Sequence, residues 1–397
     1  MKVLVRKFLK NESTSGIILM IVTCIALIFS NTFLSEFYNT FLHTPIVFKF
    51  GDSLDISKPL ILWVNDGLMA IFFLLIGLEI KRELILGHLS SFSKIALPGI
   101  AAIGGMLVPA LFFVFFNYND DFALRGWAIP TATDIAFALG IVALLGNRVP
   151  TSLKIFLMAL AIFDDLGAIL IIAFFYTSNV SFEALSLAFF TIVILYLMNK
   201  MQIKLLGAYL LVGIFLWIFI LKSGVHATLT GIILAFAIPL NLKDEEKQKR
   251  ISPVKTLQHH IHFWVAFYVL PIFAFVNAGI DLREMSIEKI SNPVSLGIIL
   301  GLFLGKQIGV LSFTYLAVKL KLAKLPKCTT WLQIYGISVL TGIGFTMSLF
   351  IDSLAYNDSD AFFYTDKLAI LIGSVLSGVL GYLILRITKN KKHCSVD

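Results

Sequence analysis

Two adjacent aspartates, Asp164 and Asp165, lie within an apolar stretch that is long enough to cross a bilayer. One ionised Asp at the centre of a spanning helix costs roughly 2.5–3.5 kcal/mol, so such residues usually mark a functional site. Two neighbouring carboxylates also repel each other, and binding of a proton or of a hard cation relieves the repulsion. The pair therefore predicts a site at which protons and metal cations compete. The alternative, an Asp-Asp helix cap, requires a helix boundary inside a run that is apolar on both sides.

Asp134 and Lys306 also lie near the middle of apolar segments, in IPTATDIAF and GLFLGKQIG. A lysine so far from a helix end cannot extend its amine to the membrane surface. Lys306 therefore requires a carboxylate or a helix C-terminus beside it. The carboxylates that the sequence offers are Asp134, Asp164 and Asp165.

Two apolar segments contain residues that interrupt helices. In IPTATDIAF, Pro130 removes a backbone donor, and the hydroxyls of Thr131 and Thr133 can satisfy the backbone groups that this frees. This combination favours a broken helix, although a proline alone often causes only a kink. Gly342 and Gly344 make a second break possible in TGIGFTMS, although glycines are also frequent at close helix contacts. The ends of a broken helix carry opposite partial charges.

Charged residues end the segment NDGLMAIFFLLIGLEIKREL, residues 65–84. Glu79 and Glu83 are four residues apart and share a helix face. They predict an acidic mouth that collects cations. An ordinary charged helix end is an equally good interpretation for Lys81 and Glu83, and a poorer one for Glu79, one turn deeper.

Three histidines, His259, His260 and His262, follow the charged loop KDEEKQKRISPVK. Imidazole titrates near neutral pH, so these residues are candidates for sensing pH. Plain histidines at the membrane interface are the favoured alternative, and no second ligand motif indicates a zinc site.

The composition places the whole chain in a membrane. Of its 397 residues 58% are hydrophobic and 14% are charged, whereas about 25% are charged in soluble proteins. Only helices satisfy the backbone of an open chain in lipid. We therefore expect an all-α polytopic membrane protein with a single domain, residues 1–397, and no nucleic-acid partner despite the net charge of +8. Twelve apolar segments are centred near residues 24, 71, 105, 134, 164, 190, 213, 232, 270, 306, 341 and 376.

The distribution of basic residues predicts the orientation. With the N-terminus in the cytoplasm, most of the 32 Lys and Arg fall in cytoplasmic segments, as the positive-inside rule requires. Twelve spans then place both termini in the cytoplasm. The first apolar run shows no small-residue cleavage site, so we interpret it as an uncleaved first helix.

The first outside loop contains IVFKFGDSLDIS, residues 46–57. Apolar residues alternate on both sides of Gly51-Asp52, which predicts a β-hairpin, although an irregular loop fits the pattern equally well. An isolated hairpin is marginally stable, so we expect it to pair, for example with a second subunit.

Several runs in this chain resemble the NhaA family of sodium/proton antiporters: NDGLMAIFFLLIGLEIKREL, TATDIAFALG, AIFDDLGAI, GVHATLTG, PIFAFVNAG, LGK and TGIGFTMS. The resemblance implies twelve helices with inverted-topology repeats (helices 3–5 and 10–12) and crossed discontinuous helices 4 and 11. It also implies a homodimer that uses the hairpin. The implied activity is exchange of Na⁺ or Li⁺ for H⁺ across the bacterial cytoplasmic membrane, for pH and sodium homeostasis.

The resemblance also implies roles for individual residues. Asp165 matches the ion-binding aspartate, and Asp164 matches its neighbour implicated in proton carriage. Thr133 and Asp134 fall on the interrupted helix, where Asp134 offsets positive helix ends. Lys306 pairs with the first aspartate or offsets negative helix ends. The positions linked to pH response are Glu79, Arg82, Glu83, His226, His259 and His262.

The chain departs from the family at Gln258, where relatives often have a Glu that can pair with the helix-two arginine, here Arg82. We therefore expect Gln258 to uncouple the two helix ends and to shift or flatten the pH response. A second departure, Gln307 in place of the commoner Pro, is expected to matter little.

The predicted function is electrogenic transport, with no enzymatic activity, no cofactor, and Na⁺, Li⁺, H⁺ and membrane lipid as partners. An intramembrane aspartyl protease also needs paired carboxylates, but they must face each other across a substrate, and adjacent residues diverge by ~100° on one helix. A cation channel needs rings of carboxylates or carbonyls around a pore, and a lone Lys306 argues against that.

Overall fold

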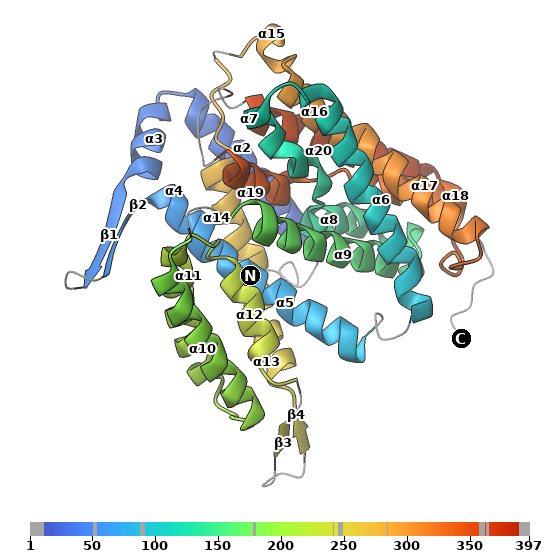
Figure 1. Cartoon of the computed structure of the whole chain (residues 1–397). Helices are drawn as coiled ribbons and strands as arrows, with labels where there is room; N and C mark the ends of the chain where they lie inside the picture. The colour runs from blue at the N-terminus through green and yellow to red at the C-terminus, as the bar shows by residue number, and fades with distance from the viewer. Residues whose placement is uncertain are drawn as a thin grey trace, which may run out of the picture. The chain divides into compact units, whose positions relative to one another are not determined.

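The computed structural model describes residues 12–50, 54–87, 92–177, 180–240, 242–244, 249–283, 285–356, 362 and 365–388, and it is mostly helical (Figure 1). The contacts divide the chain into two compact units. The first comprises Met1–Asn31, Ser91–Ala168 and Ala278–Asp397, and the second comprises Thr32–Ser90 and Ile169–Asn277. The predicted all-α class is confirmed, and the prediction of a single domain remains a prediction.

Ten helices of the described residues are long and apolar enough to cross a membrane. A helix pair bent by 43° supplies an eleventh span. The twelfth predicted segment, centred near residue 232, forms the helix α12 (Leu229–Ala237), which has nine residues. Gly224, with φ of 82°, ends the preceding helix, and Pro239 follows the end of α12, so the sequence on both sides limits its length.

The first unit contains the following elements: α2 (Glu12–Asn31), α6 (Phe92–Asn117), α7 (Asp121–Leu124), η2 (Arg125–Thr131), α8 (Ile135–Leu145), η3 (Gly146–Arg148), most of α9 (Thr151–Phe175), α15 (Ile287–Ile290), α16 (Pro293–Leu300), η5 (Gly301–Gly305), α17 (Lys306–Lys319), α18 (Trp331–Leu340), α19 (Phe345–Ala355) and α20 (Thr365–Ile387). Two of its spans are interrupted. Backbone without helical structure separates η2 from α8, and the residues after α18 separate it from α19.

Close backbone packing joins α6 to α17 in the first unit. A Cβ atom added to Gly309 of α17 would lie 2.1 Å from the carbonyl oxygen of Gly104 in α6, so only glycine permits this approach. Lys306 lies one turn before Gly309, and its amine packs close to Gly105. The glycine contact therefore helps to set the depth at which Lys306 enters the interior of the unit.

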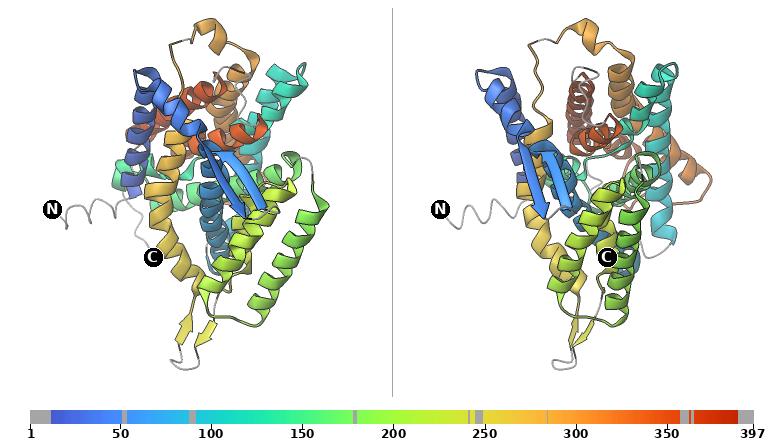
Figure 2. Two further views of the ribbon diagram at one scale, coloured as in Figure 1. Left: turned by 90° about the vertical axis from the view of Figure 1, so that its left-hand side faces the viewer. Right: turned by 60° about the vertical axis from the view of Figure 1, so that its left-hand side comes forward.

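The second unit contains α3 (Ser35–His43), β1 (Pro45–Phe50), β2 (Leu54–Pro59), α4 (Leu60–Trp63), η1 (Val64–Leu68), α5 (Met69–Leu86), the end of α9, α10 (Phe182–Lys200), α11 (Leu206–Ser223), α12, β3 (Leu242–Asp244), β4 (Lys249–Ile251), α13 (Pro253–Trp264), η4 (Val265–Val269) and α14 (Leu270–Asn277). Helices α10 and α11 lie side by side in the two views of Figure 2. Apolar side chains from α5, α10, α11 and α12 form a shared core, which includes Leu78, Leu195, Leu216 and Ala235.

Strands β1 and β2 pair antiparallel, from Pro45 opposite Pro59 to Phe50 opposite Leu54, and Figure 2 shows them as a two-stranded ribbon. The predicted hairpin is therefore confirmed, and the turn at Gly51-Asp52 lies outside the described residues. Val47 and Phe48 of β1 are more than half exposed. The hairpin thus presents apolar side chains that nothing in the described chain covers fully.

Candidate functional site

Asp164 and Asp165 lie in the middle of α9, which is helical throughout Thr151–Phe175. Both residues are almost fully buried. The prediction of two carboxylates inside a continuous spanning helix is confirmed, and the alternative of a helix cap is wrong because no helix begins at this position.

Lys306 and Asp164 form an ion pair whose Nζ and Oδ2 atoms are 2.6 Å apart, and both side chains are completely buried. The hydroxyl of Thr133 donates to the same Oδ2 atom at 2.7 Å and also lies 2.9 Å from the carbonyl oxygen of Thr341. The other carboxylate oxygen, Oδ1 of Asp164, is buried and has no hydrogen-bond partner among the described residues. Of the three candidate partners for Lys306, the structure therefore selects Asp164.

The π-helical turn η5 precedes Lys306 directly, and such turns are frequent at functional sites. Lys306 is the first residue of α17, so the irregular turn and the glycine contact with α6 both act on its position. The ammonium group of Lys306 therefore lies between the π-helical turn and the close glycine contact of the same span.

Asp134 joins the two interrupted spans. Its backbone N–H donates to the carbonyl oxygen of Ile343 at 2.6 Å. Its Oδ1 atom accepts from the backbone N–H of Phe137 in the first turn of α8, and its Oδ2 atom accepts from the backbone N–H of Thr346 in the first turn of α19. One carboxylate thus satisfies the N-terminal N–H groups of two half-helices, where partial positive charge accumulates. The predicted contact between the two breaks is present.

A second polar cluster lies in the second unit between α5 and α13. The Nε2 atom of Gln258 donates to Glu79 at 3.2 Å, and its Oε1 atom accepts from Arg82 at 3.0 Å. Arg82 also forms an ion pair with Glu83 at 2.8 Å. The expectation that Gln258 uncouples the two helix ends is wrong, because its side-chain amide forms hydrogen bonds to both Glu79 and Arg82. An amide can do so because it donates and accepts at once.

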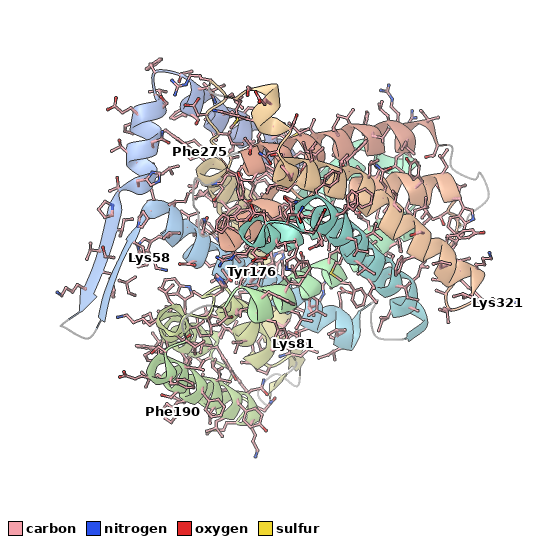
Figure 3. The ribbon with its side chains drawn as sticks, turned by 45° about the horizontal axis from the view of Figure 1, so that its top comes forward. Lys58, Lys81, Tyr176, Phe190, Phe275 and Lys321 are labelled. Atoms are coloured by element: carbon pink, nitrogen blue, oxygen red, sulfur yellow. The ribbon has the colours of Figure 1, made fainter. Side chains whose placement is uncertain are left out.

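Lys81 and Glu83 are more buried than an ordinary charged helix end would be, at 8% exposure each. The amine of Lys81, labelled in Figure 3, donates to the carbonyl oxygens of Phe236 and Ile238 at 2.7 and 2.5 Å. These carbonyls lie at the C-terminal end of α12, where partial negative charge accumulates. Lys81 therefore caps a short helix, so the interpretation of Lys81 as an ordinary helix end is wrong.

The histidines fall into two groups. His259 and His262 are exposed on α13, and the described residues contain no cluster suited to a metal ion. His226 lies between α11 and α12, where its Nε2 atom donates to the carbonyl oxygen of Tyr176 at 2.6 Å. Burial lowers the pKa of His226, although the hydrogen bond to Tyr176 and the charge of Asp66 act in the opposite direction. His226 is therefore a partly buried imidazole whose burial favours the neutral form.

The contacts of two residues, Thr346 and Lys81, were not predicted from the sequence. Thr346 stands in the quoted run TGIGFTMS, and its hydroxyl and backbone N–H both bind Asp134. A polar residue two positions after Gly344 was the available signal. Lys81 gave no signal, because its partners are backbone carbonyls.

Buried charges at the meeting point of two interrupted spanning helices define the class of ion-coupled membrane transporters, since intramembrane ionisable residues mark ion pathways. A family model described as "Na+/H+ antiporter 1" matches residues 6–385. A protein named Na(+)/H(+) antiporter NhaA from Sulfurovum sp. (strain NBC37-1) is 61% identical over 387 residues, which cover 98% of each chain. A protein of the same name from Campylobacter concisus (strain 13826) is 58% identical, over 99% of this chain and 96% of its own. A Yersinia pestis bv. Antiqua (strain Antiqua) protein of that name is 53% identical over 99% of each.

The chain belongs to the Na⁺/H⁺ antiporter 1 family of transporters. It is an integral membrane protein, as its apolar helices also indicate.

Proposed function

We propose that this chain is a secondary antiporter of the bacterial inner membrane that exchanges Na⁺ or Li⁺ for H⁺. One observation carries the proposal: the buried contact of Asp164 with Lys306 and Thr133, next to Asp165. A single oxygen of Asp164 accepts both bonds, and its Oδ1 atom has no partner among the described residues. That oxygen is available to a proton or to a cation.

Asp165 is the principal cation ligand in this proposal, and Asp164 supplies a second carboxylate. A protonated carboxyl group is a poor ligand for a hard cation, because such cations prefer anionic oxygen. The ammonium of Lys306, a proton and Na⁺ therefore compete for the same oxygens. Loading one ion lowers the affinity for the other, so inward proton movement expels the cation.

The charges predict electrogenic exchange. Two ionised aspartates with one Na⁺ carry a net charge of −1, whereas the two protonated aspartates are neutral. Each cycle then moves net charge, and the membrane potential drives it. If Lys306 carries one of the two protons instead of Asp164, the sum over the cycle is unchanged.

Asp134 and Thr133 act around the carboxylate pair. Asp134 offsets the partial positive charges at the N-termini of α8 and α19, so that the two half-helices can meet within the low-dielectric interior. The hydroxyl of Thr133 donates to Asp164, and we propose that this hydroxyl rotates when an ion binds to the carboxylate. Neither residue needs a cofactor, and we propose none beyond the transported ions.

We propose that the cluster of Glu79, Gln258, Arg82 and Glu83 collects cations and responds to pH. Glu79 and Glu83 supply the negative charge. Gln258 ties Glu79 to Arg82 without a titrating group of its own. Within this proposal His226, His259 and His262 are the further residues of the pH response.

The functional unit that we propose is a homodimer in membrane lipid, with both termini in the cytoplasm and a role in pH and sodium homeostasis. Val47 and Phe48 of β1 are exposed apolar residues, and the strand has an edge that a second hairpin can extend. The distribution of Lys and Arg supports the orientation.

The test is exchange measured with a pH-sensitive dye in everted membrane vesicles that contain the protein. After the dye is quenched by acidification, addition of Na⁺ or Li⁺ should dequench it, and K⁺ and Ca²⁺ serve as comparison cations. Asp165→Asn and Asp164→Asn should abolish the response, because each removes a charge with little change of shape. Asp281→Asn, at an exposed ion pair with Arg283, is the matched control. Normal Na⁺/H⁺ exchange by Asp165→Asn would contradict the assignment.

A further inference from the structure

Gln307 follows Lys306 directly in α17, and its side chain forms two hydrogen bonds. The Nε2 atom of Gln307 donates to the carbonyl oxygen of Phe303 in η5. Its Oε1 atom accepts from the hydroxyl of Tyr335 in α18 at 2.9 Å. Only 6% of the surface of Gln307 is exposed, so these contacts satisfy an amide that water scarcely reaches. A proline at this position has no side-chain amide and can form neither contact.

The bond to Phe303 acts on the irregular turn before Lys306. In an α-helix the carbonyl oxygen of one residue accepts from the backbone N–H group four positions later. In η5 the backbone N–H of Lys306 donates instead to the carbonyl oxygen of Gly301, five positions back. Within this altered pattern the side-chain amide of Gln307 supplies a donor to the carbonyl of Phe303. The amide therefore stabilises the π-helical turn that sets where Lys306 begins α17.

The bond to Tyr335 connects the ion site to the first half of an interrupted span. Tyr335 belongs to α18, and Thr341 follows the end of that helix. The carbonyl oxygen of Thr341 lies 2.9 Å from the hydroxyl of Thr133, which donates to Asp164. The same carboxylate oxygen binds Lys306. The contacts therefore close a ring, which passes through Asp164, Lys306, Gln307, Tyr335, Thr341 and Thr133.

We propose that Gln307 and Tyr335 are positioning residues for the exchange, because they hold the ammonium group of Lys306 against Asp164 and tie that contact to α18. This role rests on the competition between Lys306 and Na⁺ for Asp164 that is part of the proposed function. Neither Gln307 nor Tyr335 contacts the transported ion. Loss of either bond loosens the ammonium group, so that Na⁺ displaces it more readily. Gln307 in place of proline then sets the apparent affinity for Na⁺, and we set aside the expectation that it matters little.

The first test measures exchange in two variants that leave the charges unchanged. Tyr335→Phe removes one hydroxyl, and Gln307→Leu removes both hydrogen bonds. Dye dequenching in everted vesicles is recorded over a range of Na⁺ concentrations at several pH values. We expect the apparent KM for Na⁺ to fall about two- to tenfold, as the loss of a neutral hydrogen bond predicts. The acid limb of the activity–pH curve should move to lower pH, because a less stabilised ammonium is displaced there.

Tyr315→Phe is the matched control, since it removes the hydroxyl of a half-exposed tyrosine of α17 and should change neither quantity. Tyr335→Phe should add nothing further in the Gln307→Leu background, where its partner is absent. An unchanged KM, a raised KM, or a lower maximal rate at every pH with an unchanged KM would overturn the proposal. Failure of the proposed function would look different: Asp165→Asn would retain Na⁺-dependent dequenching.

The second test does not depend on transport. Lys306→Met should lower the melting temperature in detergent less in the Gln307→Leu background than in the unsubstituted chain, because contacts within one network are not additive. In the Tyr315→Phe background the loss should equal that of the unsubstituted chain. Equal losses with and without Gln307→Leu would show that Gln307 does not position Lys306, and would overturn the proposal.

Discussion

The amine of Lys306 lies 2.6 Å from one carboxylate oxygen of Asp164, and neither side chain has exposed surface. Transfer of either charge alone into such an environment is costly, whereas the pair offsets much of that cost. The structure described here is therefore the state in which Lys306, and not a transported ion, neutralises Asp164. Its stability should depend on that pairing.

Removal of one partner tests this dependence. Lys306→Met leaves Asp164 as a buried charge without its cation, which costs about 3–5 kcal/mol in comparable cases. The variant should unfold at a lower temperature in detergent at neutral pH. Asp164→Asn/Lys306→Met removes both charges and should recover most of the loss. Additive effects of the two single substitutions would show that the ion pair does not stabilise this state.

Gln258→Glu should make the α5–α13 cluster sensitive to pH. The new carboxylate would accept from Arg82 more strongly than the amide does. It would also face Glu79, where the amide now donates, so the contact to Glu79 would require a proton on one of the two carboxyl groups. The activity–pH curve should therefore shift or steepen, with Na⁺ affinity at saturating pH unchanged. If both proteins give the same curve in proteoliposomes, this contact does not set the pH response.

His226 should make the fold less stable in acid. Because burial lowers its pKa in the folded chain, the folded state binds fewer protons than the unfolded state, whose imidazole has a pKa near ~6.5. The contribution to stability is complete above that pH and is lost as the pH falls below it. His226→Gln keeps a donor for the carbonyl of Tyr176 and does not titrate. Its melting temperature should fall less than that of the unsubstituted protein between neutral pH and pH ~5, and identical declines would exclude His226 as the cause.

Deletion of residues 46–57 should yield a functional protein that dissociates more readily. The hairpin carries exposed Val47 and Phe48 and an unpaired strand edge, which favour pairing with a second copy. Light scattering in detergent should show a shift toward the monomer, while dye dequenching in vesicles should still report exchange. An unchanged dimer would remove the hairpin from the interface.

The sequence predicted the centre of the site because charge inside an apolar run is costly and therefore conspicuous. Asp134, Asp164, Asp165 and Lys306 were identified in this way, and three candidate partners for Lys306 remained. The choice of Asp164 depends on how α9 and α17 pack, which residue types do not reveal. The hairpin was equally predictable, since its turn and its alternation are local.

Contacts between a side chain and a distant backbone were not predictable. Lys81 reaches carbonyls more than 150 positions along the chain, and Thr346 reaches Asp134 only because two helix breaks meet. The bridging role of Gln258 was missed for another reason: the substitution was considered as a lost charge, whereas the amide gains a donor. At position 258 the loss of charge predicted a lost contact, whereas the hydrogen-bonding capacity of the amide preserves it.

The shortness of α12 has a consequence for membrane insertion. Nine residues extend only about 13 Å at 1.5 Å per residue, less than half of a ~30 Å hydrocarbon core. Such a segment cannot partition into lipid by itself, because its last carbonyl groups would face hydrocarbon unsatisfied. The amine of Lys81 supplies donors to those carbonyls from a helix that is synthesised much earlier. We therefore expect α12 to enter the membrane together with α5, which is synthesised first and must still be accessible when α12 emerges.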